Sequence, residues 1–204
     1  MRARSLKGDR CHIIAAMSDA QIQPPFLQQP FLETADVLYQ SADRLALHLQ
    51  YAAQAITHTL TTGGKVLCAG VAEAEWLAQQ SASLLVKGIS RERPPLAALA
   101  LSGRDDSLLA QVRALGHPGD VWLAFSLERD EPSLVAATQA ARDQDMTLVL
   151  FTGEAASVLG PLLRDTDVWV PLPGHQPARL FAVAWLALHS LCEAVDTHLL
   201  GDLA

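Results

Sequence analysis

The residues of this sequence that could do chemistry gather directly after five short apolar runs. Carboxylates can move protons or hold cations, and hydroxyl and imidazole groups can contact a polar ligand. The loops in question cover residues 70–75, 102–106, 126–131, 152–155 and 173–176. Their candidate ligand-contacting residues are Gly70, Glu73, Ser102, Ser126, Glu128, Asp130, Glu131, Thr152 and His175.

Each candidate also has an ordinary structural role. Glu73 and Glu131 stand where a following helix would begin, and a carboxylate there complements the helix dipole. The candidate Ser and Thr hydroxyls are equally suited to capping a helix or closing a turn. Of the seven histidines, only His175 is considered for ligand contact, because it lies in a strand-to-helix loop on the same side as the other candidates.

No metal, cofactor or disulfide is predicted. No two histidines have the H-x-x-x-H spacing of a helical metal site, and Asp105 and Asp106 are typical of a solvated first helical turn. Cys11, Cys68 and Cys192 are far apart and lack the C-x-x-C spacing. Such cysteines are typical of a reducing compartment, so we expect a cytoplasmic protein.

Length and composition limit the class of protein. The 204 residues are 50% hydrophobic and 18% charged, with a formal net charge of -7, which suits one full-sized domain. The excess of acidic residues argues against direct nucleic-acid binding and against docking to an anionic membrane. Polar residues interrupt the apolar runs, so we expect no transmembrane helix. Met17 is as good a candidate start as Met1.

These loops need a sheet to position them. We predict a flexible N-terminal arm over residues 1–30, rich in Gln and Pro near its end, and one domain over residues 31–204. Apolar residues at helical spacing predict a long helix over residues 31–59. Strands are predicted at residues 65–69, 96–101, 121–125, 147–151 and 168–170, and helices at 72–87, 105–114, 132–144, 155–164 and 177–199.

The strand-like runs are continuously apolar rather than alternating, which is typical of parallel strands buried on both faces. The predicted fold class is therefore α/β. We expect a three-layer α-β-α sandwich with a five-stranded parallel, flavodoxin-like sheet, in which ligands bind beyond the carboxyl ends of the strands.

From residue 31 to the C-terminus the sequence resembles the sugar isomerase (SIS) domain family. The resemblance rests above all on the stretch Gln111-Val-Arg-Ala-Leu-Gly-His-Pro-Gly-Asp-Val-Trp-Leu-Ala-Phe-Ser126. Supporting stretches are Arg91-Glu-Arg-Pro94, residues 145–153 and Leu191-Cys-Glu-Ala-Val-Asp196. The similar members are phosphoheptose isomerase and the DnaA initiator-associating protein.

The ligand loops depart from what the resemblance implies. Where the family carries Gly-Asn-Gly-x-Ser, this chain has Gly70-Val-Ala-Glu-Ala74, and where the family carries Ser-Thr-x-Gly-Asn-Ser, it has Ser126-Leu-Glu-Arg-Asp-Glu131. Three carboxylates therefore stand where the resemblance places a sugar phosphate, and a nearby carboxylate opposes a dianion. We expect sedoheptulose 7-phosphate to bind no better than millimolar.

The resemblance also implies acid–base or metal-ligating residues on two helices. At those positions this chain has Gln80, Leu84 and the run Phe181-Ala-Val-Ala184, none of which moves a proton at neutral pH. The expectation is a vestigial pocket without catalytic residues.

These departures favour a non-catalytic SIS-domain protein that works by protein binding, with the replication initiator DnaA as the partner that the resemblance implies. The alternatives are a phosphosugar isomerase of the sedoheptulose 7-phosphate type and a sensor of a small carbohydrate derivative. Family resemblance also implies a homodimer or homotetramer, with Leu45, Leu49 and Ile56 partly buried between subunits. The apolar C-terminal pair Leu199 and Leu200 is the candidate partner-binding patch, or else the edge of the oligomer core.

Overall fold

The computed structural model describes residues 25–89, 92–103, 106–153 and 158–201. By contacts the chain divides into two compact units, residues 1–36 and residues 37–204. The first unit contributes the beginning of helix α1, and the second contains every other helix and strand of the described residues. The predictions for residues 1–24, including the alternative start at Met17, concern residues outside those that the structure describes.

Five helices, one 3-10 turn and five strands make up the described chain. In order they are α1 (Pro25–Thr61), β1 (Val66–Gly70), α2 (Ala74–Lys87), β2 (Ala98–Leu101), α3 (Asp106–Leu115), β3 (Val121–Ser126), α4 (Pro132–Asp143), β4 (Thr147–Gly153), η1 (Gly160–Leu162), β5 (Val168–Leu172) and α5 (Pro177–Leu200).

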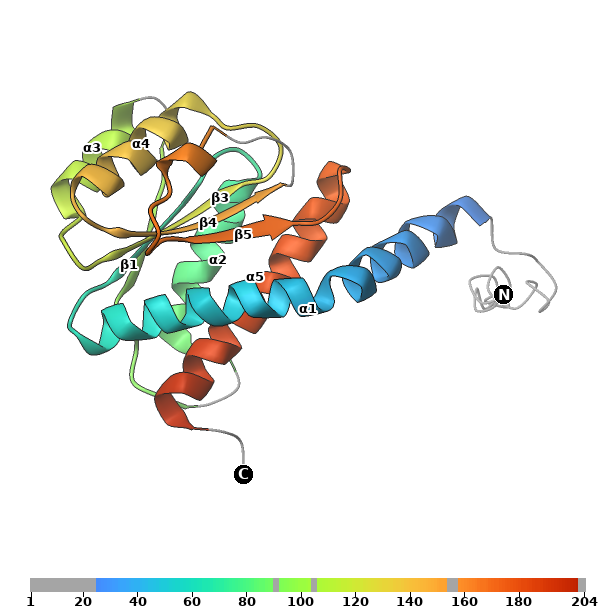
Figure 1. Cartoon of the computed structure of the whole chain (residues 1–204), viewed down its shortest axis with the longest axis horizontal. Coiled ribbons are helices and arrows are strands. Elements are labelled where there is room, and N and C mark those ends of the chain that lie inside the picture. Colours follow the sequence, from blue (N-terminus) through green and yellow to red (C-terminus); the bar gives the residue numbers. More distant parts are fainter. Residues whose placement is uncertain (1–24, 90–91, 104–105, 154–157, 202–204) are drawn as a thin grey trace, which may run out of the picture. The chain divides into compact units, whose positions relative to one another are not determined.

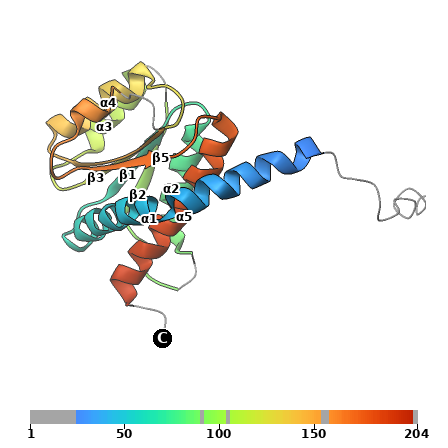
Figure 2. The ribbon, with the colours of Figure 1, turned by 45° about the vertical axis from the view of Figure 1, so that its right-hand side comes forward.

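All neighbouring strands pair in parallel, in the order β2-β1-β3-β4-β5. Helices α3 and α4 cover one face of this sheet, while α2, α5 and residues 37–61 of α1 cover the other (Figures 1 and 2). Each face has its own hydrophobic core, the larger one lying under α1, α2 and α5. The predicted three-layer α-β-α sandwich with a five-stranded parallel sheet is confirmed.

The central strands can be predicted from the sequence because they are buried along their whole length. Every residue of β1 and β3 is buried, because helices cover both faces of these central strands. At the edge, β2 is only partly buried and Leu99 is exposed, although its sequence is just as apolar. Strand β2 also begins at Ala98 rather than at residue 96, because Leu96 still follows the turn after α2, where its backbone N–H donates to the carbonyl of Leu85.

Two predicted helices also differ from the structure. Helix α1 begins at Pro25, so residues 25–30, expected in the arm, are helical. Pro25 is tolerated because it stands in the first turn, where its missing N–H has no helical partner, whereas Pro30 lies inside the helix. The predicted helix over residues 155–164 is, among its described residues, only the single 3-10 turn Gly160–Leu162, with Pro161 inside it.

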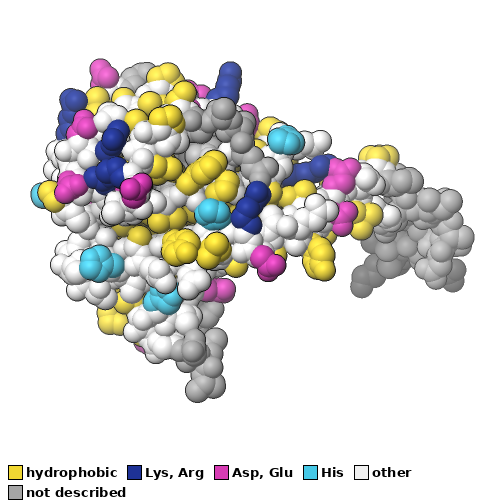
Figure 3. Space-filling model, viewed as in Figure 1, with side chains coloured by type: hydrophobic (Ala, Val, Ile, Leu, Met, Phe, Trp, Pro, Cys, Tyr) yellow, Lys and Arg dark blue, Asp and Glu magenta, His cyan; other side chains and the backbone are white. Residues whose placement is uncertain are grey.

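The residues of α1 that we expect to be partly buried between subunits are buried within the chain, and two of them, Leu45 and Leu49, also line a groove between α1 and α5. Their place in an assembly stays a prediction. Leu45, Leu49 and Ile56 are buried against the sheet-facing cluster. The outer face of α1 is partly apolar, since Tyr39 and Tyr51 are exposed, and Figure 3 shows hydrophobic side chains among histidines on this face of the molecule.

Helix α5 is the described helix that could cross a membrane on length and composition alone, contrary to the expectation from the sequence. Its most apolar 18-residue window has a mean hydropathy of 1.4 and is 44% buried. Several of its leucines and valines pack into the core under the sheet, and the core helix of a folded domain passes the same test.

Candidate functional site

A cavity of about 170 Å3 opens at the carboxyl ends of β1 and β3. This is the point where the strand order reverses, and open α/β sheets bind ligands at such switch points. The lining comes from the loops after β1 and β3 and from the starts of three helices: Val71, Ala72, Glu73, Ala74, Phe125, Ser126, Leu127, Glu128, Arg129, Glu131, Leu134 and Pro177.

The loop after β1 is held in shape by a close backbone approach. A Cβ on Gly70 would collide with the backbone carbonyl of Ala74, so only glycine fits where the strand turns into α2. Ala72 adopts a left-handed backbone with φ of 56°, which turns the chain within three residues. Glu73 then precedes the first helical residue, and its carboxylate makes no capping hydrogen bond to α2.

The loop after β3 is anchored by its own side chains. The Ser126 hydroxyl donates to Oδ1 of Asp130 over 2.7 Å, and Oδ2 of Asp130 accepts the backbone N–H of Val158 over 2.6 Å. This ties the loop to the segment that follows β4. Glu131 precedes α4, and like Glu73 it makes no capping hydrogen bond with its helix.

The structure brings Glu73, Ser126, Glu128 and Glu131 together in the lining of this cavity. Gly70 stands just before the lining residues and shapes their loop. A larger neighbouring hollow of about 750 Å3 shares Val71, Ala72 and Glu131 and extends to Asp106.

The remaining sequence candidates do not line this cavity. Asp130 is engaged with Ser126 and Val158, and the buried Thr152 hydroxyl accepts the indole N–H of Trp169 over 2.8 Å. Ser102 and His175 are exposed in their loops.

The two C-terminal leucines differ in burial. Leu199 packs partly against the core, whereas the side chain of Leu200 is exposed at the end of α5.

The charge of the cavity is set by three glutamates and one arginine. Glu73, Glu128 and Glu131 line it with Arg129 as the single cation of the lining. Glu73 and Glu131 place their negative charge at the amino ends of α2 and α4, where helix dipoles favour an anion. The chain therefore supplies its own anions at two positions where a bound phosphate would otherwise be favoured.

Carboxylates that make no capping bond can accept hydrogen bonds from hydroxyl groups or remove a proton from carbon. In the part of the chain that the structure describes, no three His, Cys, Asp or Glu side chains are grouped so that they could hold a metal ion. The chemistry that the glutamates of the cavity offer is proton transfer and recognition of hydroxyl groups.

An aromatic cluster lies between the two helices at which the resemblance implies acid–base residues, and Phe181, one member of the cluster, stands at one of those positions. Trp76 of α2 lies 5.5 Å from Phe181 and 4.7 Å from Trp185 of α5, measured between ring centroids. His189 continues the row, with its ring 4.4 Å from that of Trp185 in an edge-on arrangement. Four aromatic rings thus cover the boundary between these two helices.

Comparison with known proteins places this architecture. The SIS domain family matches residues 31–153. The chain belongs to the SIS domain family.

Two similar relatives are both named phosphoheptose isomerase. The chain is 40% identical over 189 residues to a phosphoheptose isomerase from Methylibium petroleiphilum, covering 86% of this chain and 94% of the relative. It is 35% identical over 188 residues to another from Aromatoleum aromaticum, covering 86% and 95%.

Two solved SIS-domain structures agree. A phosphoheptose isomerase from Francisella tularensis superposes with a TM-score of 0.80 at 26% identity, over 85% of this chain and 97% of that one. One from Neisseria gonorrhoeae superposes with a TM-score of 0.78 at 26% identity, over 85% and 98%.

These relatives correct the function expected from the sequence. The prediction of a non-catalytic protein that acts through DnaA is wrong, because relatives at 40% and 35% identity over most of the chain are named phosphoheptose isomerases. The expected kinship with the SIS family and its phosphoheptose isomerase group is confirmed.

The SIS-domain site also contains residues that sequence reasoning did not single out. Val71, Leu127 and Phe125 contribute apolar lining beside the acidic residues, and Pro177 closes the cavity from the start of α5. The first three adjoin candidates in the same loops. Pro177 directly follows the predicted loop 173–176, but only the folded sheet brings the start of α5 beside the ends of β1 and β3.

Proposed function

We propose that this protein is a sugar isomerase of the phosphoheptose isomerase type, which binds a phosphorylated sugar at the β1/β3 cavity and interconverts its aldose and ketose forms. The observation that carries the proposal is a pair of carboxylates without capping bonds, Glu73 and Glu131, in a cavity at the switch point of a SIS-domain sheet. The shared name of the relatives supplies the substrate class.

The reaction needs one base that moves a proton between neighbouring carbons. The base removes a proton from the carbon beside the carbonyl, the carbonyl oxygen gains a proton to give an enediol, and the proton returns to the former carbonyl carbon while the neighbouring hydroxyl loses its own. Atoms and electrons balance without an oxidant. A carboxylate serves as such a base. Glu73 and Glu131 both line the cavity without a capping bond, each after one of the two strands at the switch point, and we choose Glu73, after β1, as the base.

The phosphate must be accommodated in an acidic cavity. Arg129 is the lining residue that can pair with it, since a guanidinium forms strong hydrogen bonds with phosphate oxygens. Glu128 and Glu131 oppose the same charge. We therefore expect weak binding that depends on Arg129 and falls with added salt.

A second candidate function, favoured by the loss of acid–base residues on α2 and α5, is binding of a sugar derivative without turnover. Gln80, Leu84 and Phe181 hold the positions concerned. The two candidates share the cavity and differ in whether any product forms.

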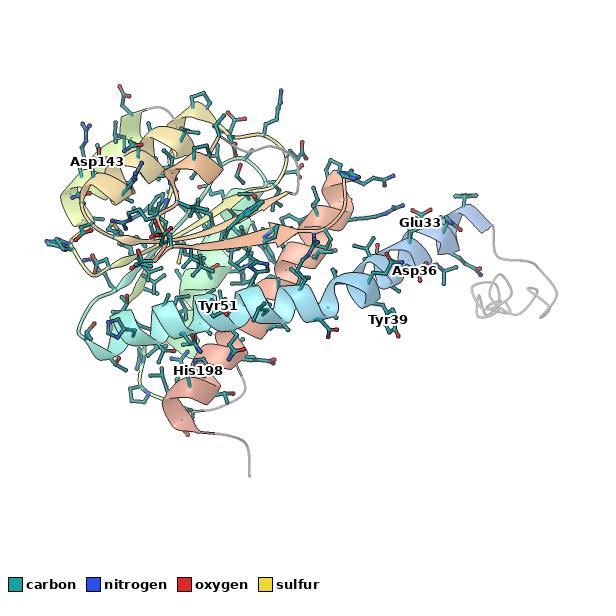
Figure 4. All side chains as sticks on the ribbon, viewed as in Figure 1. Glu33, Asp36, Tyr39, Tyr51, Asp143 and His198 are labelled. Carbon is teal, nitrogen blue, oxygen red and sulfur yellow. The ribbon has the colours of Figure 1, made fainter. Side chains whose placement is uncertain are left out.

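One assay separates the two candidates. Purified protein is incubated with sedoheptulose 7-phosphate, and the aldose phosphate product is measured by chromatography. Glu73→Gln should abolish turnover while keeping the fold, whereas Asp143→Asn, a matched change at the far end of α4 (Figure 4), should leave turnover unchanged. Absence of product with the unaltered protein would refute turnover, and calorimetry on the same mixture would then decide whether binding without turnover holds.

The cytoplasmic location expected from the cysteines is part of this proposal. Cys68 and Cys192 are free and buried in the described structure, which fits a reducing compartment. Imaging of the protein fused to a fluorescent tag, together with cell fractionation, would test it.

A further inference from the structure

An indole ring is exposed in the first turn of α2. Trp76 of α2 is 42% exposed, although it contacts Phe181 and Trp185 of α5. Trp122 behaves quite differently: it is fully buried under α4, and its indole N–H donates to the Thr138 hydroxyl over 3.0 Å. Trp122 fills the core, whereas Trp76 leaves a large part of its aromatic surface in water.

Two residues of the aromatic cluster follow cavity-lining residues by one helical turn, one on each helix. Glu73 of the lining and Trp76 are three residues apart, so they share one side at the start of α2. Pro177 of the lining and Phe181 are four residues apart on α5 and also share a side. The aromatic surface thus begins about one helical turn, roughly 5 Å, from the lip of the cavity on two adjacent helices.

The chemistry of this surface fits a sugar. One face of a sugar ring carries mainly C–H bonds, and the negative face of an aromatic ring attracts such polarised C–H groups. The hydroxyl groups at the rim of the same sugar are donors that suit carboxylate acceptors. Aromatic rings near glutamates that make no capping bond therefore offer the two kinds of contact that a sugar uses, stacking on its C–H face and hydrogen bonds from its hydroxyl groups.

We propose that Trp76, supported by Phe181 and Trp185, forms a stacking wall that binds the sugar ring of the substrate while Glu73 accepts its hydroxyl groups. This inference rests on the proposed function, because it assigns a specificity residue to the same cavity. Phe181 and Trp185 are positioning residues: they hold the indole of Trp76 in place from α5. The wall binds the sugar portion and makes no contribution to phosphate recognition.

The test compares variants of the full chain by calorimetry with sedoheptulose 7-phosphate, and with inorganic phosphate as a second probe. Trp76→Leu should weaken sugar phosphate binding by roughly tenfold, while Trp76→Phe, which keeps an aromatic face, should retain most of it. Binding of inorganic phosphate should be the same in all variants. Tyr39→Leu is the matched control, because Tyr39 is an 87% exposed aromatic side chain that projects from α1 and does not line the cavity (Figure 4).

The outcomes separate this inference from the proposed function. No binding of the sugar phosphate by the unaltered protein overturns both. Binding that survives Trp76→Leu, or that falls equally in Tyr39→Leu, overturns the stacking wall alone. The exposed aromatic face could instead bind a second copy of the chain, and light scattering on the same samples tests this. If Trp76→Leu loses its assembly, the face belongs to an interface between copies, and the stacking wall is overturned.

Discussion

Arg93 and Asp196 form an ion pair inside the core although they are 103 positions apart in the chain. The side chains are 1% and 6% exposed, and the Nε of Arg93 donates to Oδ1 of Asp196. The two terminal nitrogens of the Arg93 guanidinium donate to the carbonyl oxygens of Leu84 and Leu85, which belong to the last turn of α2. One guanidinium thus satisfies the end of α2 and fastens it to α5.

Removing the charge of Asp196 should destabilise the fold strongly. Asp196→Asn leaves a buried, unpaired guanidinium, which costs roughly 3 kcal/mol in free energy of unfolding. Asp145→Asn is the control, because Asp145 pairs with Arg164 while 79% exposed, and such a surface pair contributes at most about 1 kcal/mol. Urea unfolding of both variants measures the difference, and equal losses would contradict the importance of burial.

Replacing Gly70 should disturb the cavity through the backbone. Gly70→Ala sets a Cβ against the carbonyl of Ala74, so the start of α2 and Glu73 must shift. We expect a loss of roughly 2 kcal/mol or more in free energy of unfolding, together with loss of sugar phosphate binding. Gly160→Ala is the control, since a Cβ there meets no atom within 4 Å. A stable Gly70→Ala protein with unaltered binding would show that the loop tolerates the change.

The parallel sheet could be predicted because helices bury the central strands on both faces, which leaves continuous apolar runs in the sequence. The exposed Leu99 shows the limit of that signal: an edge strand and a central strand can have the same composition. The acidic loops could also be placed at one edge of the sheet from the sequence, because they directly follow the predicted strands.

The rest of the site depends on contacts between distant parts of the chain. The predicted loop over residues 173–176 places Pro177 at the correct edge of the sheet, but nothing in the sequence indicates that it reaches the cavity beside the β1 loop. Likewise, nothing near Trp76 indicates that its neighbours are on α5. The function inferred from missing family residues was wrong for a related reason. Comparing the loops position by position shows which side chains differ from the family motifs. The similarity to phosphoheptose isomerases, by contrast, extends over most of the chain, helices and strands included.

Two buried thiols should make the stability depend on alkaline pH. Burial, with a smaller contribution from Asp196, raises the pKa of Cys192 from its ordinary value of 9.0 to about 12, and burial also raises the pKa of Cys68. Below pH 9 both thiols are neutral in the folded and unfolded states, and their contribution is fully present. Between pH 9 and 12 only the unfolded chain ionises, so each thiol lowers the free energy of unfolding by up to about 1.4 kcal/mol per pH unit.

The measurement is urea unfolding between pH 8 and 11 for the unaltered protein and for Cys192→Ala. Other groups also titrate in this range, so the readout is the difference between the two slopes rather than the absolute loss. The decline should be shallower in Cys192→Ala, because one ionising thiol is gone from the unfolded chain. Identical slopes would mean that Cys192 ionises equally readily in the folded protein.

Assembly of the chain is predicted to involve the groove between α1 and α5. This groove encloses about 460 Å3 and is lined largely by apolar residues, including Leu38 and Leu186, and Leu186 is half exposed. A second copy could bury it through a two-fold interface in which the same surface serves both partners. Leu186→Glu would then place a charge in that interface, and dissociation is expected because an unpaired charge is costly to bury.

Light scattering at micromolar concentration tests this. The unaltered protein, whose chain mass is 21.9 kDa, should show the mass of a dimer or tetramer, and Leu186→Glu should shift it toward the mass of a single chain. Val158→Glu is the matched control, because Val158 is also exposed but does not line the groove. A single-chain mass for the unaltered protein would refute assembly. An intact assembly in Leu186→Glu would show that the interface does not include this groove, because a glutamate there would be buried without a partner.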